Sequence, residues 1–388
     1  MKTILLFFLL ASSVFSAQMV KGTVVDDTGH RIDNVNIYLD GTKTGTVSKE
    51  DGSFTLNLST QKYGNLVFQK EDYETFTTGL PDVINKNSKI LLIKTSINEE
   101  KKIAPFTSEA HEKYINYFLN TFIGVDQENV KIKNLKSLKF SYDERNRFLT
   151  IKASKPLIIE NKNLGYEISY NLISFSTDFK RSNMVNYTGT SFFKETKNTD
   201  NVKLNRMNAY EGSFLHFLRS IYDNKIVETG FIIYEANRTP NPFYPSEKEL
   251  NTLNNYLESA TQSELNSIPE NIKDISRRKN DQSPYLLTIS KTNATDADYV
   301  KRLSGQVFLN FKDILKINYS KFYYELKGKD FVKRKNRNLL SSFLYSEGGS
   351  FEISKEGNIT TPDQLINEGD FSKNKIENML PLDYQLGD

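Results

Sequence analysis

Four side chains in one short segment could together bind an anion or transfer a proton. They are Arg206, Tyr210, His216 and Arg219. A histidine can serve as a general base, and an arginine can hold an anionic group through its planar set of N–H donors. We therefore regard these four side chains as the candidate binding residues of the chain.

The same segment lacks the features that would make it catalytic. No serine lies in a Gly-x-Ser-x-Gly turn, and no nucleophile or pair of carboxylates stands at a fixed spacing from these residues. A structural polar network that joins a helix to a sheet explains the pattern better than an active site does. No catalytic residue is assigned.

The element that must position these side chains is a helix that begins after a glycine. Ser213 is a suitable N-cap, because its hydroxyl can accept a hydrogen bond from the first turn. The apolar residues that follow at helical spacing are Phe214, Phe217, Leu218 and Ile221. His216 and Arg219 are then expected to point partly away from that apolar face.

Metal and thiol chemistry are not expected. The chain has no cysteine, so it can form no disulfide and no thiolate metal site. Its histidines are His30, His111 and His216, and none of them is followed by glutamate three residues later. A zinc carboxypeptidase needs a His-x-x-Glu pair and a distant histidine around an open zinc position. We therefore expect no metal, no cofactor and no zinc carboxypeptidase activity.

Short β patterns alternate with turn signals from Val20 to Ile93. In the segments 35–39 and 54–58 every second residue is apolar, so each segment presents one apolar face. Asp51 and Gly52 form a hairpin signal. The predicted strands are 20–25, 35–39, 44–48, 54–58, 66–68 and 90–93. This spacing predicts a β-sandwich of two sheets.

The glycines of this region carry a resemblance to a known family. The pattern is Gly22-x-Val24-x-Asp26-x-x-Gly29, then Gly41-Thr42-x-x-Gly45-Thr46, then Asp51-Gly52-x-Phe54. It resembles the carboxypeptidase regulatory-like domain, a module of immunoglobulin- or transthyretin-like fold. We expect Gly22, Gly29, Gly41, Gly45 and Gly52 to be structural turn glycines, because turns between strands need positive φ. Arg31, Lys49 and Asp72 depart from residues that the family usually carries near its turns.

The resemblance implies a cellular setting and no enzymatic activity. The family's domain is an accessory module, and in Bacteroidota it precedes many TonB-dependent outer-membrane receptors and other envelope proteins. The segment 164–170, together with 205–219, is similar to a second region of exported Bacteroidota proteins to which no activity is assigned. The chain is thus expected to be an exported Bacteroidota protein with a C-terminal region of unassigned function.

The first residues favour export. One lysine, an apolar run from Ile4 to Leu10 and small residues before Gln18 predict a signal peptide over 1–17, with cleavage after Ser16 or after Ala17. No other apolar run has spanning length, so no transmembrane span is expected in the mature chain. The formal net charge of +3 gives no reason to expect nucleic acid as a partner.

The remainder of the chain is predicted to be β-rich with a few helices. Residues 18–96 are expected to form the sandwich, 97–105 a linker and 106–388 a larger antiparallel domain. A helix capped by Thr107 or Ser108 should precede strands between 138 and 191. Residues 245–282 are expected to be a helical or flexible insertion, and strands resume at 285–290 and 305–318. The basic run 333–337 and the pair Gly348-Gly349 are expected to lie in a turn and a loop.

The sequence thus predicts a mainly β protein, α+β overall, made of an immunoglobulin-like sandwich and a larger antiparallel domain. Its expected function is non-catalytic binding of a protein or glycan partner in the periplasm or at the outer membrane, with the cell surface also open. Two alternatives remain at this point. One is an envelope hydrolase that uses the region of His216 and Arg219, and the other is an accessory subunit of a TonB-linked transport system.

Overall fold

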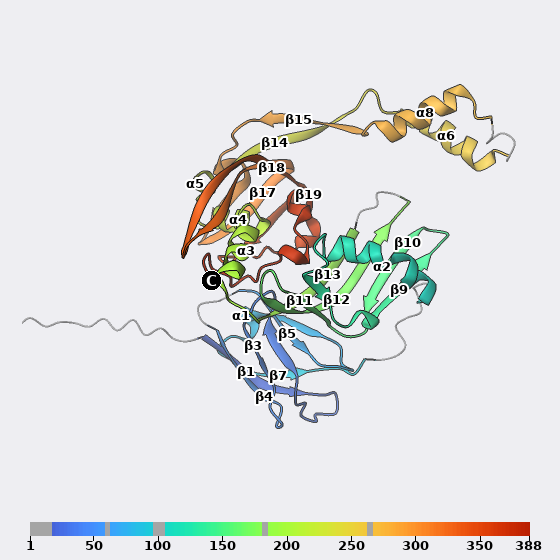
Figure 1. Ribbon diagram of the computed structural model, residues 1–388. Coiled ribbons are helices and arrows are strands. Elements are labelled where there is room, and N and C mark those ends of the chain that lie inside the picture. The colour runs from blue at the N-terminus through green and yellow to red at the C-terminus, as the bar shows by residue number, and fades with distance from the viewer. Residues whose placement is uncertain (1–17, 59–62, 96–104, 181–184, 262–266) are drawn as a thin grey trace, which may run out of the picture. The chain divides into compact units, whose positions relative to one another are not determined.

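The computed structural model describes residues 18–58, 63–95, 105–180, 185–261 and 267–388 (Figure 1). Strands make up 44% of it and helices 24%, which confirms the predicted mainly β fold class. The predicted signal peptide, with both candidate cleavage positions, lies outside the described residues. All but the last residue of the predicted linker at 97–105 also lies outside them.

The chain folds into two compact units. Unit 1 comprises Met1–Arg206 and Lys375–Asp388, and unit 2 comprises Met207–Asn374. The boundary falls within helix α3 (Asp200–Tyr210), and the last residues of the chain return to unit 1. These boundaries differ from the domains expected from the sequence, because residues 106–206 belong to the same unit as the sandwich.

The N-terminal part of unit 1 is the predicted β-sandwich. One sheet has the order β4-β1-β7 and the other the order β3-β2-β5-β6. Alternation places the apolar residues inside, as in β4, where Phe54, Leu56 and Leu58 are buried. The elements are β1 (Gln18–Val25), β2 (Asn36–Leu39), β3 (Gly45–Val47), β4 (Ser53–Leu58), β5 (Asn65–Gln69), β6 (Phe76–Gly79), α1 (Leu80–Val83) and β7 (Asn87–Leu91).

Two of the five predicted turn glycines serve another purpose. Gly29, Gly41 and Gly52 have positive φ, as expected for turns, but Gly22 and Gly45 do not. Gly22 lies inside β1, where a Cβ atom would stand 2.0 Å from the carbonyl oxygen of Ser88 in β7. The glycine there allows close approach of two strands. At Gly45, in β3, a Cβ atom would stand 2.7 Å from the ring of Phe192. The predictions of turns at Gly22 and Gly45 are therefore wrong.

Besides the two sheets of the sandwich, unit 1 contains a third sheet, which is covered by one helix and which we call the α2 sheet. Its strand order is β8-β11-β12-β10-β9, with β13 paired to β12. Phe118 and Phe122 of α2 are fully buried, and their rings lie 5.1 Å from Phe175 and Tyr170 respectively. The elements are α2 (Ser108–Phe122), β8 (Val130–Ile132), η2 (Leu135–Ser137), β9 (Leu138–Asp143), β10 (Phe148–Ala153), β11 (Leu157–Asn161), β12 (Tyr166–Asp178) and β13 (Val185–Glu195). Thr107 caps α2 by accepting from the amide of Ala110, as predicted.

Direct hydrogen bonds join the sandwich to the α2 sheet. The amide of Gly41 donates to the carbonyl of Ser191 at 2.8 Å, and the amide of Phe193 donates to the carbonyl of Thr42 at 3.0 Å. The hydroxyl of Tyr38 lies 3.0 Å from that of Thr190. The β2–β3 end of the sandwich and β13 therefore pack as one body.

The C-terminal segment completes unit 1. After η5 (Ile376–Asn378), the amide of Leu382 donates to the carbonyl of Gly41 at 2.6 Å, and Tyr384 is fully buried. On the side of α2, the amide of Glu377 donates to the carbonyl of Ile123 at 3.0 Å. Residues 375–388 thus contact both the sandwich and the segment that follows α2, at Ile123.

Unit 2 is built on one antiparallel sheet with the order β15-β14-β17-β18-β19, and β16 also pairs with β17. Its strands are β14 (Phe231–Pro240), β15 (Tyr285–Lys291), β16 (Val300–Leu303), β17 (Gln306–Lys327), β18 (Asp330–Ile353) and β19 (Ile366–Gly369). The other elements are α4 (Phe214–Tyr222), α5 (Ile226–Thr229), α6 (Glu247–Ser259), α8 (Glu270–Asp281), α9 (Asp296–Tyr299), η3 (Pro362–Gln364) and η4 (Phe371–Lys373).

Two predicted turns of this unit are wrong. The basic run 333–337 and the pair Gly348-Gly349 both lie inside β18, which pairs with β17 along almost its whole length. Shifts of register between Phe311 and Asp313 and between Ser320 and Phe322 accommodate the irregular residues. Bulges of this kind let a strand continue through residues that read as a turn in isolation.

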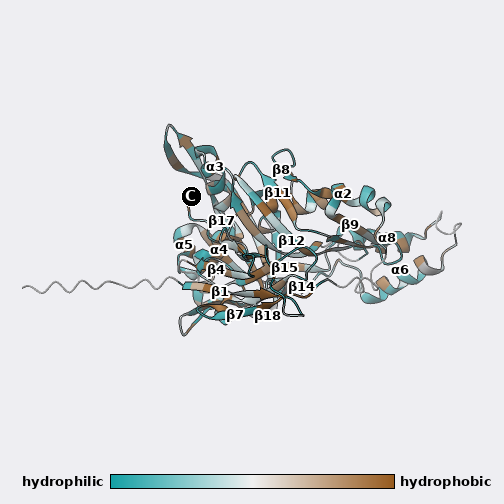
Figure 2. Cartoon of the chain, turned by 90° about the horizontal axis from the view of Figure 1, so that it is seen from below, coloured by the Kyte–Doolittle hydropathy of each residue, from teal (hydrophilic) through white to brown (hydrophobic). Residues whose placement is uncertain are grey.

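A protruding element of unit 2, which we call the arm, comprises residues 237–261 and 267–291. From Asn237 onward β14 pairs with β15 only, since its pairing with β17 ends at Ala236. This two-stranded ribbon leads to α6 and α8 (Figure 1). The two helices pack on each other through Leu253, Ile272 and Ile275. Both helices carry hydrophilic as well as hydrophobic residues (Figure 2). Within the described residues no helix is both long and apolar enough to cross a bilayer.

Candidate functional site

The segment singled out by the sequence comprises the end of α3, the turn after it and most of α4. Ser213 is the N-cap and accepts a hydrogen bond from the amide of His216 at 3.1 Å, as predicted. Gly212 has a φ of +73°, and a Cβ atom there would stand 2.6 Å from the ring of Tyr319. The turn therefore brings the chain directly against β17. The face of α4 that carries Phe217 and Ile221 is fully buried in the core of unit 2.

His216 is buried, with 6% of its surface exposed. The expectation that it points partly away from the apolar face is therefore wrong. Its Nδ1 accepts a hydrogen bond from the amide of Gly212 at 3.1 Å, so a neutral ring carries its proton on Nε2. The ring stacks on Tyr210 at 4.7 Å and lies 5.1 Å from Phe231. Burial lowers the pKa of His216 to about 4, which keeps the ring neutral at pH 7.

Glu211 lies at the centre of this cluster and was not singled out from the sequence. Its side chain is 2% exposed and accepts a hydrogen bond from the hydroxyl of Tyr319. Lys333 of β18 places its Nζ 2.7 Å from Oε1 of Glu211. The buried carboxylate thus has both a hydrogen-bond donor and a cation, as a charge away from water requires.

The sequence contained a partial signal for these partners. Glu211 stands inside the segment 205–219, and Lys333 begins the basic run that was assigned to a turn. Tyr319 lies just beyond the predicted strand 305–318, within β17. Their meeting depends on the pairing of β17 with β18, which local patterns do not specify.

Tyr210 and Arg219 complete the cluster. The guanidinium of Arg219 lies over the ring of Tyr210, 5.6 Å from its centroid, and Nε of Arg219 donates to the carbonyl of Glu356 at 3.0 Å. Burial raises the pKa of the Tyr210 hydroxyl. Tyr210, His216 and Arg219 are therefore neighbours, as the sequence hypothesis of one polar cluster requires.

Arg206, the fourth candidate, belongs to unit 1 and takes part in a different network. Its side chain is fully buried and donates to Oε1 of Glu195 at 2.6 Å. It also donates to the carbonyls of Leu164 at 2.8 Å and Lys197 at 2.9 Å, while its guanidinium lies over the ring of Tyr166. This arginine fastens α3 to the loop before β12 and to the end of β13.

The chemistry available to the cluster in unit 2 is limited. The ring nitrogen of His216 that faces Glu211 is occupied by the amide of Gly212, and the carboxylate of Glu211 is neutralised by Lys333. In the described part of the chain no group of three acidic, histidine or cysteine side chains could hold a metal ion. This arrangement ties α4 to the strands β17 and β18.

The arm offers a different kind of candidate surface. Every residue of β15 is exposed, and Tyr285, Leu286, Leu287 and Ile289 each have between 39% and 50% of their surface open. Phe243 and Leu257, near the two ends of α6, are 69% and 53% exposed. Large exposed apolar groups gathered on one element are typical of an interaction surface.

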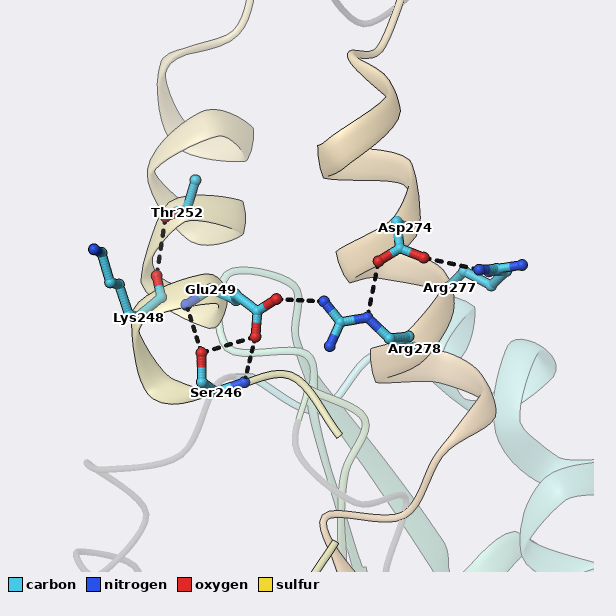
Figure 3. A network of polar contacts seen from close by, with 7 residues as sticks. All are labelled: Ser246, Lys248, Glu249, Thr252, Asp274, Arg277 and Arg278. Atoms are coloured by element: carbon cyan, nitrogen blue, oxygen red, sulfur yellow. Dashed lines mark hydrogen bonds and ion pairs between the residues drawn. The ribbon is translucent and has the colours of Figure 1, made fainter. Parts of the chain in front are cut away.

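Polar contacts hold the end of the arm together (Figure 3). Ser246 and Glu249 form a capping box at the start of α6, and Glu249 also pairs with Arg278 of α8. Arg278 contacts Asp274 on its own helix at 2.9 Å. The hydrogen bond from Arg278 is the main cause that lowers the pKa of Glu249 to about 2. These contacts fix how α6 and α8 face each other and leave Phe243 and Leu257 exposed.

Sequence comparison assigns the first domain only. Residues 20–103 match the family model of the CarboxypepD_reg-like domain, which confirms the resemblance for the β-sandwich. No match is found among the curated proteins. The matched residues include none of the strands β8 to β19 and no part of unit 2.

Proposed function

We propose that the protein is a non-catalytic binding protein of the bacterial cell envelope that engages a protein partner through its arm. The observation that carries the proposal is the exposure of large apolar side chains along β15 and α6. Most of these side chains are aliphatic, and they suit a protein partner better than a glycan, whose surface is dominated by hydroxyl groups.

The cellular setting is part of the same proposal. Two features favour an exported protein of Bacteroidota, in the periplasm or at the outer membrane. They are the signal-peptide pattern over 1–17 and the regulatory-like domain that follows it at residues 20–103. The regulatory-like sandwich would act as an accessory module, in keeping with the family's role. No separate enzymatic task is assigned to unit 1 or unit 2.

A non-catalytic role is also favoured by the cluster of Glu211, His216 and Lys333. A general base needs a free lone pair within reach of a substrate, and burial with internal partners opposes both conditions. The cluster contributes to stability, and its variants should change folding before they change binding.

The test is recovery of a stoichiometric partner from envelope fractions by the immobilised mature protein. The amount of partner recovered should fall at least tenfold in a variant that combines Phe243→Ser with Leu257→Ser, because this variant removes two exposed apolar groups of the arm. The matched control is Val227→Ser on α5, which is 85% exposed and lies outside the arm. Equal recovery by all three proteins would contradict a binding role for the arm.

A further inference from the structure

The outer edge of β15 has the properties of a strand that is ready to pair. β15 is the first strand in the order of its sheet, so only β14 neighbours it. In the part of the chain that the structure describes, no strand pairs with its other edge. The backbone N–H and C=O groups along that edge can therefore form a ladder with an added strand.

This edge lacks the features that usually protect exposed strands. No charged residue occurs from Tyr285 to Ser290, and the only proline nearby, Pro284, precedes the strand. The irregularity in its pairing with β14 lies at the far end, between Ile289 and Lys291. By contrast, the opposite edge strand of the sheet, β19, is short and carries Glu368. Charges, prolines and bulges are the common means by which edges avoid pairing.

We infer that the occupant of this edge is β15 of a second copy of the chain, paired antiparallel about Leu287. This inference rests on the proposed function of the arm as a binding element, because it names the partner of one of its edges. In this register Tyr285 faces Ile289 of the second copy, and Leu287 faces its own equivalent. All three apolar residues on that face of the strand then meet apolar residues.

Other symmetric registers are less favourable. A centre at Thr288 would place Tyr285 opposite Lys291 of the second copy, and a centre at Leu286 would leave Ile289 opposite Ser283. Cross-strand apolar pairs stabilise a sheet by roughly 0.2–1 kcal/mol each relative to alanine pairs. The sequence of β15 therefore favours the register about Leu287.

Charge also favours a second copy as the occupant. The paired residues 285–289 of the two copies carry no charge, so they meet without repulsion between like charges. A two-fold interface needs a surface that is complementary to itself. In this register residues 285–289 of each copy are paired, so five residues on each side form a small contact. Stable interfaces bury about 1,200–2,000 Å² in total, so we expect a dimer whose population depends on protein concentration.

The absence of cysteine from the chain makes cross-linking a direct test of the register. Leu287→Cys should form a disulfide-linked dimer under mild oxidation, because directly paired residues have Cα atoms about 4.5–5.5 Å apart, within reach of a disulfide. Tyr285→Cys alone should not cross-link, since the two sulfurs would be about four residues, or about 13 Å, apart. An equimolar mixture of Tyr285→Cys and Ile289→Cys should cross-link again.

The control for random collision is Val227→Cys, whose position is exposed and lies outside the arm. If Leu287→Cys cross-links no faster than this control, the inference is overturned. It is also overturned if Tyr285→Cys alone cross-links at the rate of the mixture, because that would mean an unspecific contact.

Sedimentation velocity gives an independent measurement without oxidation. The dimer fraction of the full chain should rise with concentration and fall at least tenfold in Leu287→Lys, which places two positive charges at the two-fold axis. Val227→Lys should behave as the unmodified chain. If the chain stays monomeric at all concentrations while Phe243→Ser with Leu257→Ser still loses an envelope partner, the dimer is refuted and the proposed function stands. If neither effect is seen, both are refuted.

Discussion

At the scale of single residues, the fold buries two of the four side chains that the sequence singled out, Arg206 and His216. His216 and Arg206 have polar partners on several sides, and each joins a helix to neighbouring strands or loops. A buried polar group without its partner is costly, so these residues are needed for folding whatever the protein binds. The polar network predicted between a helix and a sheet is present around Glu211 and His216, and Arg206 forms a second network of its own.

The depressed pKa of His216 leads to a prediction about stability and pH. The folded protein holds this pKa at about 4, and the ordinary value is 6.5, so the unfolded chain binds more protons between these values. The contribution of His216 to the free energy of unfolding should therefore be fully present above pH 6.5. The free energy of unfolding should fall by up to about 3 kcal/mol as the pH drops to 4.

The variant His216→Asn isolates this contribution. Its amide oxygen can still accept from Gly212 but does not titrate, so the decrease between pH 6.5 and 4 should shrink. Urea unfolding at several pH values measures the difference between the two proteins. Other groups that titrate in this range contribute equally to both proteins, so their effect cancels in the comparison. One of them is Asp40, whose pKa is raised to about 6 by burial. Parallel pH profiles for both proteins would show that His216 is not the cause.

At the scale of elements, a ribbon of two strands joins the arm to the rest of unit 2. Its helices share a small core of Leu253, Ile272 and Ile275, with Tyr256 and Ile268 packed against it. The ion pairs in Figure 3 are partly exposed to water and add little to stability. The helix pair should therefore open independently of the main sheet.

Leu253→Ala should loosen the helix pair without unfolding unit 2. Removing a buried leucine costs about 2–5 kcal/mol, more than so small a core can supply. Hydrogen exchange should become much faster for amides in α6 and α8 and should stay unchanged in β17 and β18. The exposed Leu257→Ala is the matched control. Faster exchange throughout β17 in Leu253→Ala would mean that the arm and the sheet unfold together.

Elements were predictable from the sequence where one face is buried and alternation is clean. The sandwich strands and α2 have this pattern, and the structure contains them close to the predicted positions. The run 333–337 predicts a turn because consecutive basic residues have no apolar alternation. It forms part of β18 because β17 provides a partner over a long register and Glu211 provides a carboxylate for Lys333. A long-range partner of this kind leaves no local signal in the sequence.

At the scale of the whole molecule, unit 1 is assembled from two separate stretches of the chain. Residues 375–388 supply contacts to Gly41, Lys43, Ile123 and Asn161, which lie far away in the sequence. No periodic pattern marks these last residues, so their role in the core of unit 1 could not be predicted. Tyr384 is their most deeply buried side chain.

Tyr384→Ala should destabilise unit 1 although it lies near the end of the chain. Replacing a large buried aromatic residue by alanine typically costs about 3–5 kcal/mol. The loss should appear as faster hydrogen exchange in β2, β3 and β13, while β17 and β18 of unit 2 keep their protection. Gln385→Ala, at an exposed neighbouring position, should leave exchange unchanged. Equal loss of protection in both units would argue against a role confined to unit 1.

The return of the last residues to unit 1 has a consequence for the order in which the chain can fold as it emerges from the ribosome. Residues 207–374 emerge as one uninterrupted stretch and bring every strand of their own sheet with them. The N-terminal unit, although it emerges first, must wait for Leu382 and Tyr384 before its core is closed. Most proteins complete their domains in the order of synthesis. In this chain the second unit can finish first, and until then a chaperone or a protease would meet the surface around Gly41 uncovered.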